Sequence, residues 1–235
     1  MKQNAISPVS AFTRVELVVV IAVVIVLASM IVPPSMGKAR VQRLVCMSNL
    51  SETGIACRLW PSPGDQRLAR LADPGAIWTN YANLLKSATN LTPKILVCPS
   101  DERLAAKDFK NDFNDNSHVS YFFSATGSDS YPQSIAAGDR NLGPGIVPVP
   151  DYGYSPTNGR GNDVAVPISG PVSWSLKMHS AGNTAGAGNV LLGDGSVMPV
   201  SSRIFSLNLL SNSPPTTNWP VGHVPSVPSI RLVFP

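Results

Sequence analysis

The N-terminal part of the chain contains one long apolar run with a single acidic residue at its start. Residues 17–32 read LVVVIAVVIVLASMIV, and Glu16 precedes them. Counted from Phe12, the run has about 20 residues, enough at 1.5 Å per residue to cross the ~30 Å hydrocarbon core of a bilayer. The pattern predicts a transmembrane segment over about 12–32. A cleaved secretory signal peptide is the alternative.

Helical spacing continues after Pro33 and Pro34. Apolar residues recur at near-helical intervals, namely Val41, Leu44, Val45, Leu50, Ile55 and Leu59. A proline pair kinks a helix because proline lacks a backbone donor and crowds the preceding turn. We therefore predict one long helix over 12–60, kinked at Pro33, whose first half spans the membrane and whose second half packs on a domain.

The rest of the chain predicts short elements joined by loops. A short helix is expected over 76–85, and fourteen of the 22 prolines lie from Pro132 onward, where long helices and long central strands are disfavoured. Strands are expected over 95–98 and 119–124, and a hairpin over 189–198, where Gly193-Asp194-Gly195 supplies the turn. Together with the N-terminal helix, this pattern indicates an α+β protein with one globular domain over 61–235.

Composition removes several function classes. The 235-residue chain has a net charge of +4, but its Lys and Arg residues are scattered, so we expect no nucleic-acid partner. The three histidines lie in no nucleophile elbow or His-Glu-x-x-His setting. Asp194 fits the role of a turn residue and His179 that of a structural histidine, so catalysis is not needed to explain either. We therefore expect no enzyme activity.

The segment from Ala11 to Glu16, followed by the apolar run, resembles the N-terminal processing motif of type IV pilins and type II secretion pseudopilins. The resemblance implies a leader peptide over 1–11, a cut by a prepilin peptidase between Ala11 and Phe12, and methylation of Phe12. Glu16 then becomes the fifth residue of the mature chain, and Pro33 matches a helix-kinking proline of the family. Ala11 and Arg14 depart from the family pattern.

The same resemblance implies a fold, a location and a function. The fold would be pilin-like, a long N-terminal helix packed on a small antiparallel sheet with loop-rich decoration. The protein would be a single-pass protein of the bacterial inner membrane with a periplasmic C-terminal domain, although a count of positive charges around the helix favours the opposite orientation. Its function would be that of a structural subunit in a type II secretion pseudopilus or a related pilin-like filament.

The expected partners follow from that function. They are other pilin-like subunits in a homo- or hetero-oligomer, the prepilin peptidase, an inner-membrane assembly platform and the lipid bilayer. Glu16 would pair with the N-terminal amine of a neighbouring subunit, because a desolvated carboxylate needs a partner. The alternative is that Glu16 lies among lipid headgroups, beside Arg14 or the chain's own amine. The alternative function is a membrane-anchored extracytoplasmic binding domain that does not polymerise.

Further segments resemble elements of pseudopilin-like proteins. Cys46-Met47-Ser48-Asn49-Leu50 and Cys98-Pro99-Ser100-Asp101 match two of their signatures, and Gly138-Asp139-Arg140-Asn141-Leu142 matches a third, to which we assign no chemical role. His179 with Asp194 and Gly195 resembles a C-terminal His and Asp-Gly motif, with a longer spacing. The shared signatures favour a Cys46–Cys98 disulfide. A Cys57–Cys98 pair and three buried free thiols are the alternatives.

Metal binding is expected to be limited to a calcium candidate. Asp108, Asp112 and Asp115 are interleaved with asparagines and offer hard oxygen ligands, but their spacing is not that of a known calcium loop. A solvated polar turn is the other interpretation. No other cofactor is expected.

Overall fold

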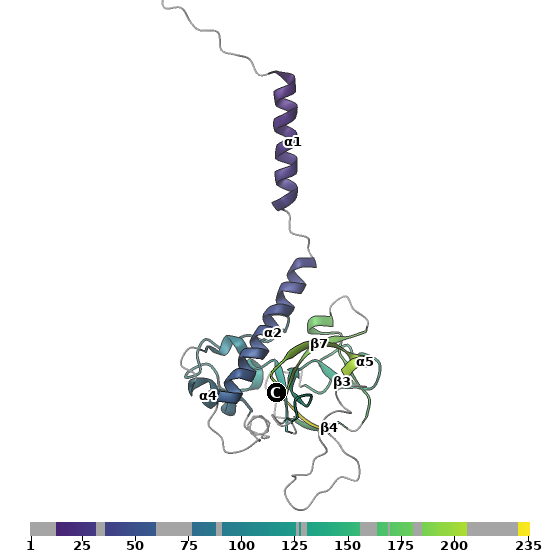
Figure 1. Ribbon diagram of the computed structural model, residues 1–235. Coiled ribbons are helices and arrows are strands. Elements are labelled where there is room, and N and C mark those ends of the chain that lie inside the picture. The colour runs from purple at the N-terminus through teal and green to yellow at the C-terminus, as the bar shows by residue number, and fades with distance from the viewer. Residues whose placement is uncertain are drawn as a thin grey trace, which may run out of the picture. The chain divides into compact units, whose positions relative to one another are not determined.

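The structure is a computed structural model. It describes residues 13–31, 36–59, 77–87, 91–125, 127, 131–155, 164–168, 170–180, 185–205 and 230–235. The chain divides into two compact units, Met1–Lys38 and Ala39–Pro235. Figure 1 shows the elements along the chain, from α1 in purple to the C-terminal residues in yellow.

The first unit contains helix α1, Arg14–Ile31, whose start is closed by a capping box. The backbone N–H and the hydroxyl of Thr13 both donate to Glu16 Oε2, at 2.8 and 2.7 Å, and Glu16 N donates back to Thr13 Oγ1 at 3.3 Å. Such reciprocal bonds satisfy donors that the first helical turn leaves open. The Glu16 carboxylate is thus part of the local structure that starts the helix.

The predicted single long helix over 12–60 is wrong. The structure has two separate helices in this region, α1 and α2, Met36–Leu59. Pro33 and Pro34 belong to the segment between them, which lies outside the described residues. Proline removes a backbone donor and disfavours helical geometry in the preceding residue, which explains why α1 ends before the pair.

The predicted membrane span is also corrected. None of the described helices is both long and apolar enough to cross a membrane. Helix α1 has 18 residues, about 27 Å at 1.5 Å per residue, and its first turn contains Arg14 and Glu16. The finding overturns the transmembrane segment over about 12–32 and the inner-membrane, single-pass location. Nothing in the structure supports the pseudopilin and secretion assignments, and the function as a filament subunit stays a prediction.

The second unit is built on a six-stranded antiparallel sheet. The order is β4-β8-β1-β2-β6-β7. Its strands are β1, Tyr121–Ser124; β2, Ile135–Asp139; β4, Val164–Ile168; β6, Ala187–Leu192; β7, Val197–Ser201; and β8, Ile230–Phe234. A smaller sheet pairs β3, Leu142–Pro144, with β5, Val172–Trp174. The large sheet replaces the expected pilin-like arrangement of a long helix on a small sheet.

Two hydrophobic core clusters lie on opposite faces of this sheet, because neighbouring side chains of a strand point to opposite faces. Tyr121 and Phe123 belong to the first cluster, whereas Phe122 belongs to the second. The first cluster also contains Cys46 and Leu50 of α2, and Tyr81 and Leu85 of α4, Ile77–Ser87. The second contains Val172 and Trp174 of β5, and Phe205, which follows α5, Ser202–Ile204.

Local predictions had mixed outcomes. The hairpin is confirmed by β6 and β7, the helix over 76–85 by α4, and part of the segment 119–124 by β1. The strand predicted over 95–98 is wrong, because Pro93–Leu96 forms a 3₁₀ helix, η1. Proline lies in the first turn of η1, where its fixed φ and missing donor suit a helix start.

Candidate functional site

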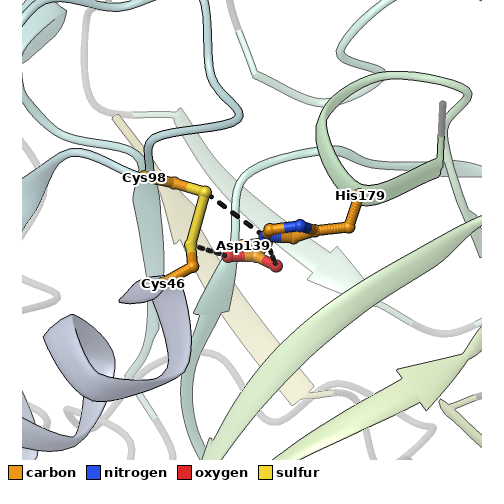
Figure 2. Close-up of side chains that lie close together, drawn as sticks. All are labelled: Cys46, Cys98, Asp139 and His179. Carbon is orange, nitrogen blue, oxygen red and sulfur yellow. Dashed lines mark hydrogen bonds and ion pairs between the residues drawn. A yellow bond between two sulfur atoms is a disulfide. The ribbon is translucent and has the colours of Figure 1, made fainter. Parts of the chain in front are cut away.

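Four side chains from distant parts of the sequence meet inside the second unit, as Figure 2 shows. Cys46 comes from α2, Cys98 follows η1, Asp139 ends β2, and His179 lies in the 3₁₀ helix η3, Met178–Ser180. The two cysteines and Asp139 have no solvent exposure, and the His179 side chain is 2% exposed. The structure joins Cys46 and Cys98, the pair favoured from the sequence, in a disulfide bond. We refer to these four residues as the buried cluster.

Short distances connect the members of the buried cluster. Cys98 Sγ lies 3.3 Å from His179 Nε2, which lies 3.5 Å from Asp139 Oδ2. Asp139 Oδ1 is 3.5 Å from Cys46 Sγ. One candidate ligand atom from each residue falls within 4.8 Å of the other three. The cluster is therefore tight enough for all four groups to act on one atom.

Surrounding groups direct hydrogen-bond donors at the cluster. Asn189 N donates to Asp139 Oδ2 at 2.7 Å, and Ser100 N donates to Cys98 Sγ at 3.4 Å. The Tyr121 hydroxyl lies 3.4 Å from Cys46 Sγ. Burial raises the pKa of Tyr121 well above its ordinary value, so the phenol keeps its proton and acts as donor. These contacts place positive partial charge around the two sulfurs and the carboxylate.

Arg43 of α2 adds a full positive charge near the cluster. Its guanidinium donates from Nε to Asn189 Oδ1 and from Nη2 to Gly188 O, each at 3.3 Å. Because these two acceptors belong to β6, the contacts also tie α2 to that strand. The charge of Arg43 lowers the pKa values of both Asp139 and His179, although it is not the main influence on either.

Burial controls the protonation of the two ionisable groups. It raises the pKa of Asp139 to about 7 and, assisted by Arg43, lowers the pKa of His179 to about 4. The imidazole is therefore neutral at pH 7, and its contact with Asp139 is not a full ion pair.

The geometry differs from that of a cysteine–histidine–aspartate relay. In such a relay the carboxylate contacts one ring nitrogen and the nucleophile contacts the other. Here Cys98 Sγ and Asp139 Oδ2 both face Nε2 of His179. Both sulfurs are also fully buried, so a reagent reaches them only when the surrounding structure opens.

An ion pair beside the cluster fixes the loop that carries Cys98. Asp101 accepts two bonds from Arg140, from Nε to Oδ2 at 2.7 Å and from Nη2 to Oδ1 at 2.8 Å. Ser120 Oγ donates to Oδ2 at 2.6 Å. Burial alone would raise the pKa of Asp101, but Arg140 and Ser120 outweigh it, and the pKa lies below its ordinary value. The Gly138–Leu142 run, left without a role by sequence reasoning, thus supplies both Asp139 and Arg140.

The other half of the C-terminal motif lies in the β6–β7 turn. Asp194 Oδ1 accepts from the backbone and hydroxyl of Ser196, at 2.8 and 2.6 Å, which closes the turn. Gly195 has a φ of 83°, a left-handed conformation that favours glycine. Among the contacts that the structure describes, none joins Asp194 or Gly195 to His179. The two halves of the motif therefore have separate roles, one in the β6–β7 turn and the other in the buried cluster.

The three calcium candidates each close a local turn. Asp108 accepts from the backbone of Lys110 and Asn111, Asp112 accepts from Lys107 N, and Asp115 accepts from Ser117. Within the described part of the chain, the group of carboxylates, cysteines and histidines close enough to share a metal is the buried cluster, which includes none of the three. The structure does not bring Asp108, Asp112 and Asp115 together.

The N-terminal candidates lie in or beside the first unit. Glu16 forms the capping box with Thr13, and its pKa is lowered by the backbone and side-chain bonds from that residue. The predicted processing site, Ala11 and Phe12, and the kink residue Pro33 lie outside the described residues. Cleavage at that site and a pairing of Glu16 with another subunit stay predictions.

Sequence reasoning missed Asp139, Tyr121 and Arg43. The resemblance around Asp139 was visible but carried no chemistry, because its partners lie far away in the sequence. Thr13 was also missed, although Thr13-x-x-Glu16 before an apolar run is the pattern of a capping box.

Comparison of the chain with protein-family models, curated proteins and solved structures found no match.

Proposed function

We propose that this protein is a structural subunit that assembles with further copies of itself through α1. The observation that carries the proposal is the exposure of that helix. Every Val, Leu and Ile from position 15 to position 27 is 50–72% exposed. At roughly 25 cal/mol per Å² of apolar surface removed from water, covering these side chains provides a large driving force for association.

The distribution of this apolar surface favours several neighbours over one. The exposed side chains occupy consecutive positions and so point to all sides of α1. A helix that is apolar all round requires burial on every side, and a single groove would leave part of it in water. Further copies of the same chain supply matching helices in equal number, so a bundle of α1 helices covers more of this surface than a single groove does.

Charges at the start of α1 favour parallel copies in the same register. Arg14 and Glu16 are two residues apart, about 3 Å along the helix axis. In a parallel bundle, Arg14 of one copy reaches the level of Glu16 in the next, whereas an antiparallel neighbour would place both charges against apolar side chains. The resemblance of this segment to pilin-like filament subunits supports the same arrangement. The proposal involves no catalysed reaction.

A charge introduced on α1 tests the proposal. Ile25 on α1 and Ile146 on the second unit are both exposed, at 63% and 79%, and each can be replaced by Glu in the full-length protein. Sedimentation velocity and chemical crosslinking then report the size of the assembly. We expect Ile25→Glu to shift the protein toward monomer and Ile146→Glu to leave its size unchanged. Monomeric wild type, or equal effects of the two variants, would sink the proposal.

Substitutions of Glu16 separate its role in the helix from a role between copies. Gln can accept the same bonds from Thr13 but has no charge, whereas Ala loses both. If a charge pair between copies sets the register, Glu16→Gln weakens assembly while the circular dichroism of the helix is unchanged. Assembly of Glu16→Gln at wild-type strength would show that Glu16 acts as a helix cap alone.

A further inference from the structure

We propose that, in its reduced form, the buried cluster is a site for a divalent metal ion of the zinc class. The four ligands are Cys46 Sγ, Cys98 Sγ, His179 Nε2 and Asp139 Oδ1. Two thiolates, an imidazole and a carboxylate form a ligand set that Zn²⁺ accepts in tetrahedral geometry. The oxidised form, in which the sulfurs are bonded to each other, lacks two of these ligands.

The positions of the four atoms fit such a site. Zinc bonds of about 2.3 Å to sulfur and 2.0–2.2 Å to nitrogen and oxygen give tetrahedral edges of about 3.4–3.8 Å. The observed distances are 3.3 Å from Cys98 Sγ to His179 Nε2 and 3.5 Å from Cys46 Sγ to Asp139 Oδ1. His179 Nε2 lies 3.5 Å from Asp139 Oδ2, the other oxygen of the same carboxylate, and one candidate ligand atom from each of the four residues lies within 4.8 Å of the rest. The main change on metal binding is the separation of the two sulfurs to about 3.8 Å.

The change between the two forms is a balanced reaction. A dithiol reductant gives two electrons and two protons to the Cys46–Cys98 bond, which breaks into two thiols, while the reductant becomes a disulfide. Zn²⁺ then binds both sulfurs, and the two thiol protons leave to water. In the reverse direction, a small-molecule disulfide takes two electrons from the two thiolates and two protons from water and becomes a dithiol, while the metal is released and the Cys46–Cys98 bond forms again.

The surroundings of the cluster suit an occupied site. Metal ligands are commonly held by outer groups that orient them and stabilise their charge. Tyr121 and Ser100 direct donors at the two sulfurs, and Asn189 N occupies Asp139 Oδ2, leaving Oδ1 to face Cys46. Two thiolates and one carboxylate around Zn²⁺ sum to one negative charge, which the nearby Arg43 offsets.

The burial of the ligands indicates a structural metal. Four protein ligands close a tetrahedral zinc site, whereas catalytic sites keep a position open for water or substrate. The metal would connect α2, the loop after η1, strand β2 and η3, of which the disulfide links only the first two. The reduced protein would thereby retain a crosslink in place of the lost covalent bond.

Titration with Co²⁺ and Zn²⁺ tests the site. The full-length protein is reduced with a phosphine, which competes weakly for these metals, and compared with the oxidised protein. We expect one Co²⁺ per reduced chain, with the visible absorption of a tetrahedral ion and a thiolate charge-transfer band, and displacement by Zn²⁺. The oxidised chain should show none of these signals. Equal binding by both forms, or none by the reduced form, would overturn the proposal.

Variants connect the signal to the named ligands. His179→Ala should abolish the tetrahedral spectrum, whereas His118→Ala should retain it, because His118 contacts the backbone oxygen of Leu104 away from the cluster. Tyr121→Phe removes a donor to Cys46 and should weaken zinc affinity by about tenfold. A spectrum that survives His179→Ala would place the metal elsewhere.

Reduction could unfold the protein, and a second measurement covers that case. Circular dichroism of the reduced chain is followed while zinc is added to wild type and to His179→Ala. If reduction unfolds the chain, we expect zinc to restore the folded spectrum of wild type alone. Zinc that refolds neither protein, or refolds both equally, would refute the site.

Discussion

Replacement of Arg140 by Met perturbs the buried ion pair that holds the Cys98 loop. Met keeps much of the aliphatic volume and removes the charge, so Asp101 is left with the Ser120 hydroxyl and the more distant charge of Arg103. The variant also loses the guanidinium that lies 3.5 Å from the centre of the Tyr152 ring and its bond to Ser155 Oγ. The Arg140 and Asp101 side chains are only 3% and 0% exposed.

The expected loss follows from that burial. Breaking a buried pair by removing one partner typically costs about 3–5 kcal/mol of unfolding free energy, because the remaining charge has no partner. We expect Arg140→Met to lower the unfolding free energy by about 3 kcal/mol at pH 7, since Ser120 and Arg103 remain close to Asp101. Replacing Asp101 by Asn in the same variant should recover part of the loss, because the uncompensated charge is then absent.

The loss of stability in Arg140→Met should depend on pH, because the substitution changes the pKa of Asp101. In wild type, the lowered pKa of Asp101 gives stability that is present above its unfolded pKa and is lost as pH falls through the folded pKa. In Arg140→Met, burial dominates and the pKa of Asp101 rises, so its contribution to stability falls as pH rises above the unfolded value. The difference in stability between the two proteins should therefore shrink on acidification from pH 7 to pH 4.

Urea denaturation at several pH values measures both effects. The control is Lys177→Met, which removes an exposed pair with Glu102, the neighbour of Asp101. Exposed pairs contribute about 0–1 kcal/mol, so this variant should differ little from wild type. A loss below about 1 kcal/mol for Arg140→Met, or a loss that does not change with pH, would refute the reasoning.

Two further predictions concern the disulfide and the β6–β7 turn. Reducing the Cys46–Cys98 bond without metal should lower the unfolding free energy by about 4 kcal/mol, because the bond closes a loop between residues 52 positions apart and so limits the entropy of the unfolded chain. Equal urea midpoints with and without phosphine would contradict this prediction. Gly195→Ala should lower the unfolding free energy by about 2 kcal/mol, because its φ is 83° and an added Cβ would overlap the guanidinium of Arg58. Gly145 is the control, because its φ is 88° and an added Cβ would have no atom within 4 Å. Gly145→Ala should lower the unfolding free energy by only about 1 kcal/mol. Equal losses for the two variants in thermal denaturation would show that Arg58 moves aside freely.

Local patterns predicted local structure well. The β6–β7 hairpin follows from alternating apolar residues around Asp194-Gly195, and α4 follows from a short periodic segment after turn residues. The failures came where proline competed with apolar periodicity. The segment 95–98 looked like a strand, but Pro93 starts a 3₁₀ helix, and the single helix expected over 12–60 is two helices, α1 and α2.

The buried cluster could be predicted only in part. The sequence indicated Cys46 and Cys98 as partners, but it gave no reason to place Asp139 or His179 beside them. Their approach depends on long-range strand order, because β2 must pair with both β1 and β6 before Asp139 meets Asn189. Met178 has a φ of 54°, uncommon for a residue other than glycine, and this turn brings His179 to the cluster.

The Gly138–Leu142 run explains how these distant pieces are held together. Asp139 lies inside the cluster, and Arg140 fixes the loop that carries Cys98 through Asp101. Asn141 Nδ2 donates to Lys177 O at 3.0 Å and to Ala187 O at 3.3 Å, on either side of η3. A buried amide with such acceptors restrains the backbone around His179, because breaking these bonds would leave polar groups unsatisfied. Three consecutive residues thus position both sulfur and imidazole around one carboxylate, which is why a run to which the sequence alone assigned no chemical role controls the geometry of the site.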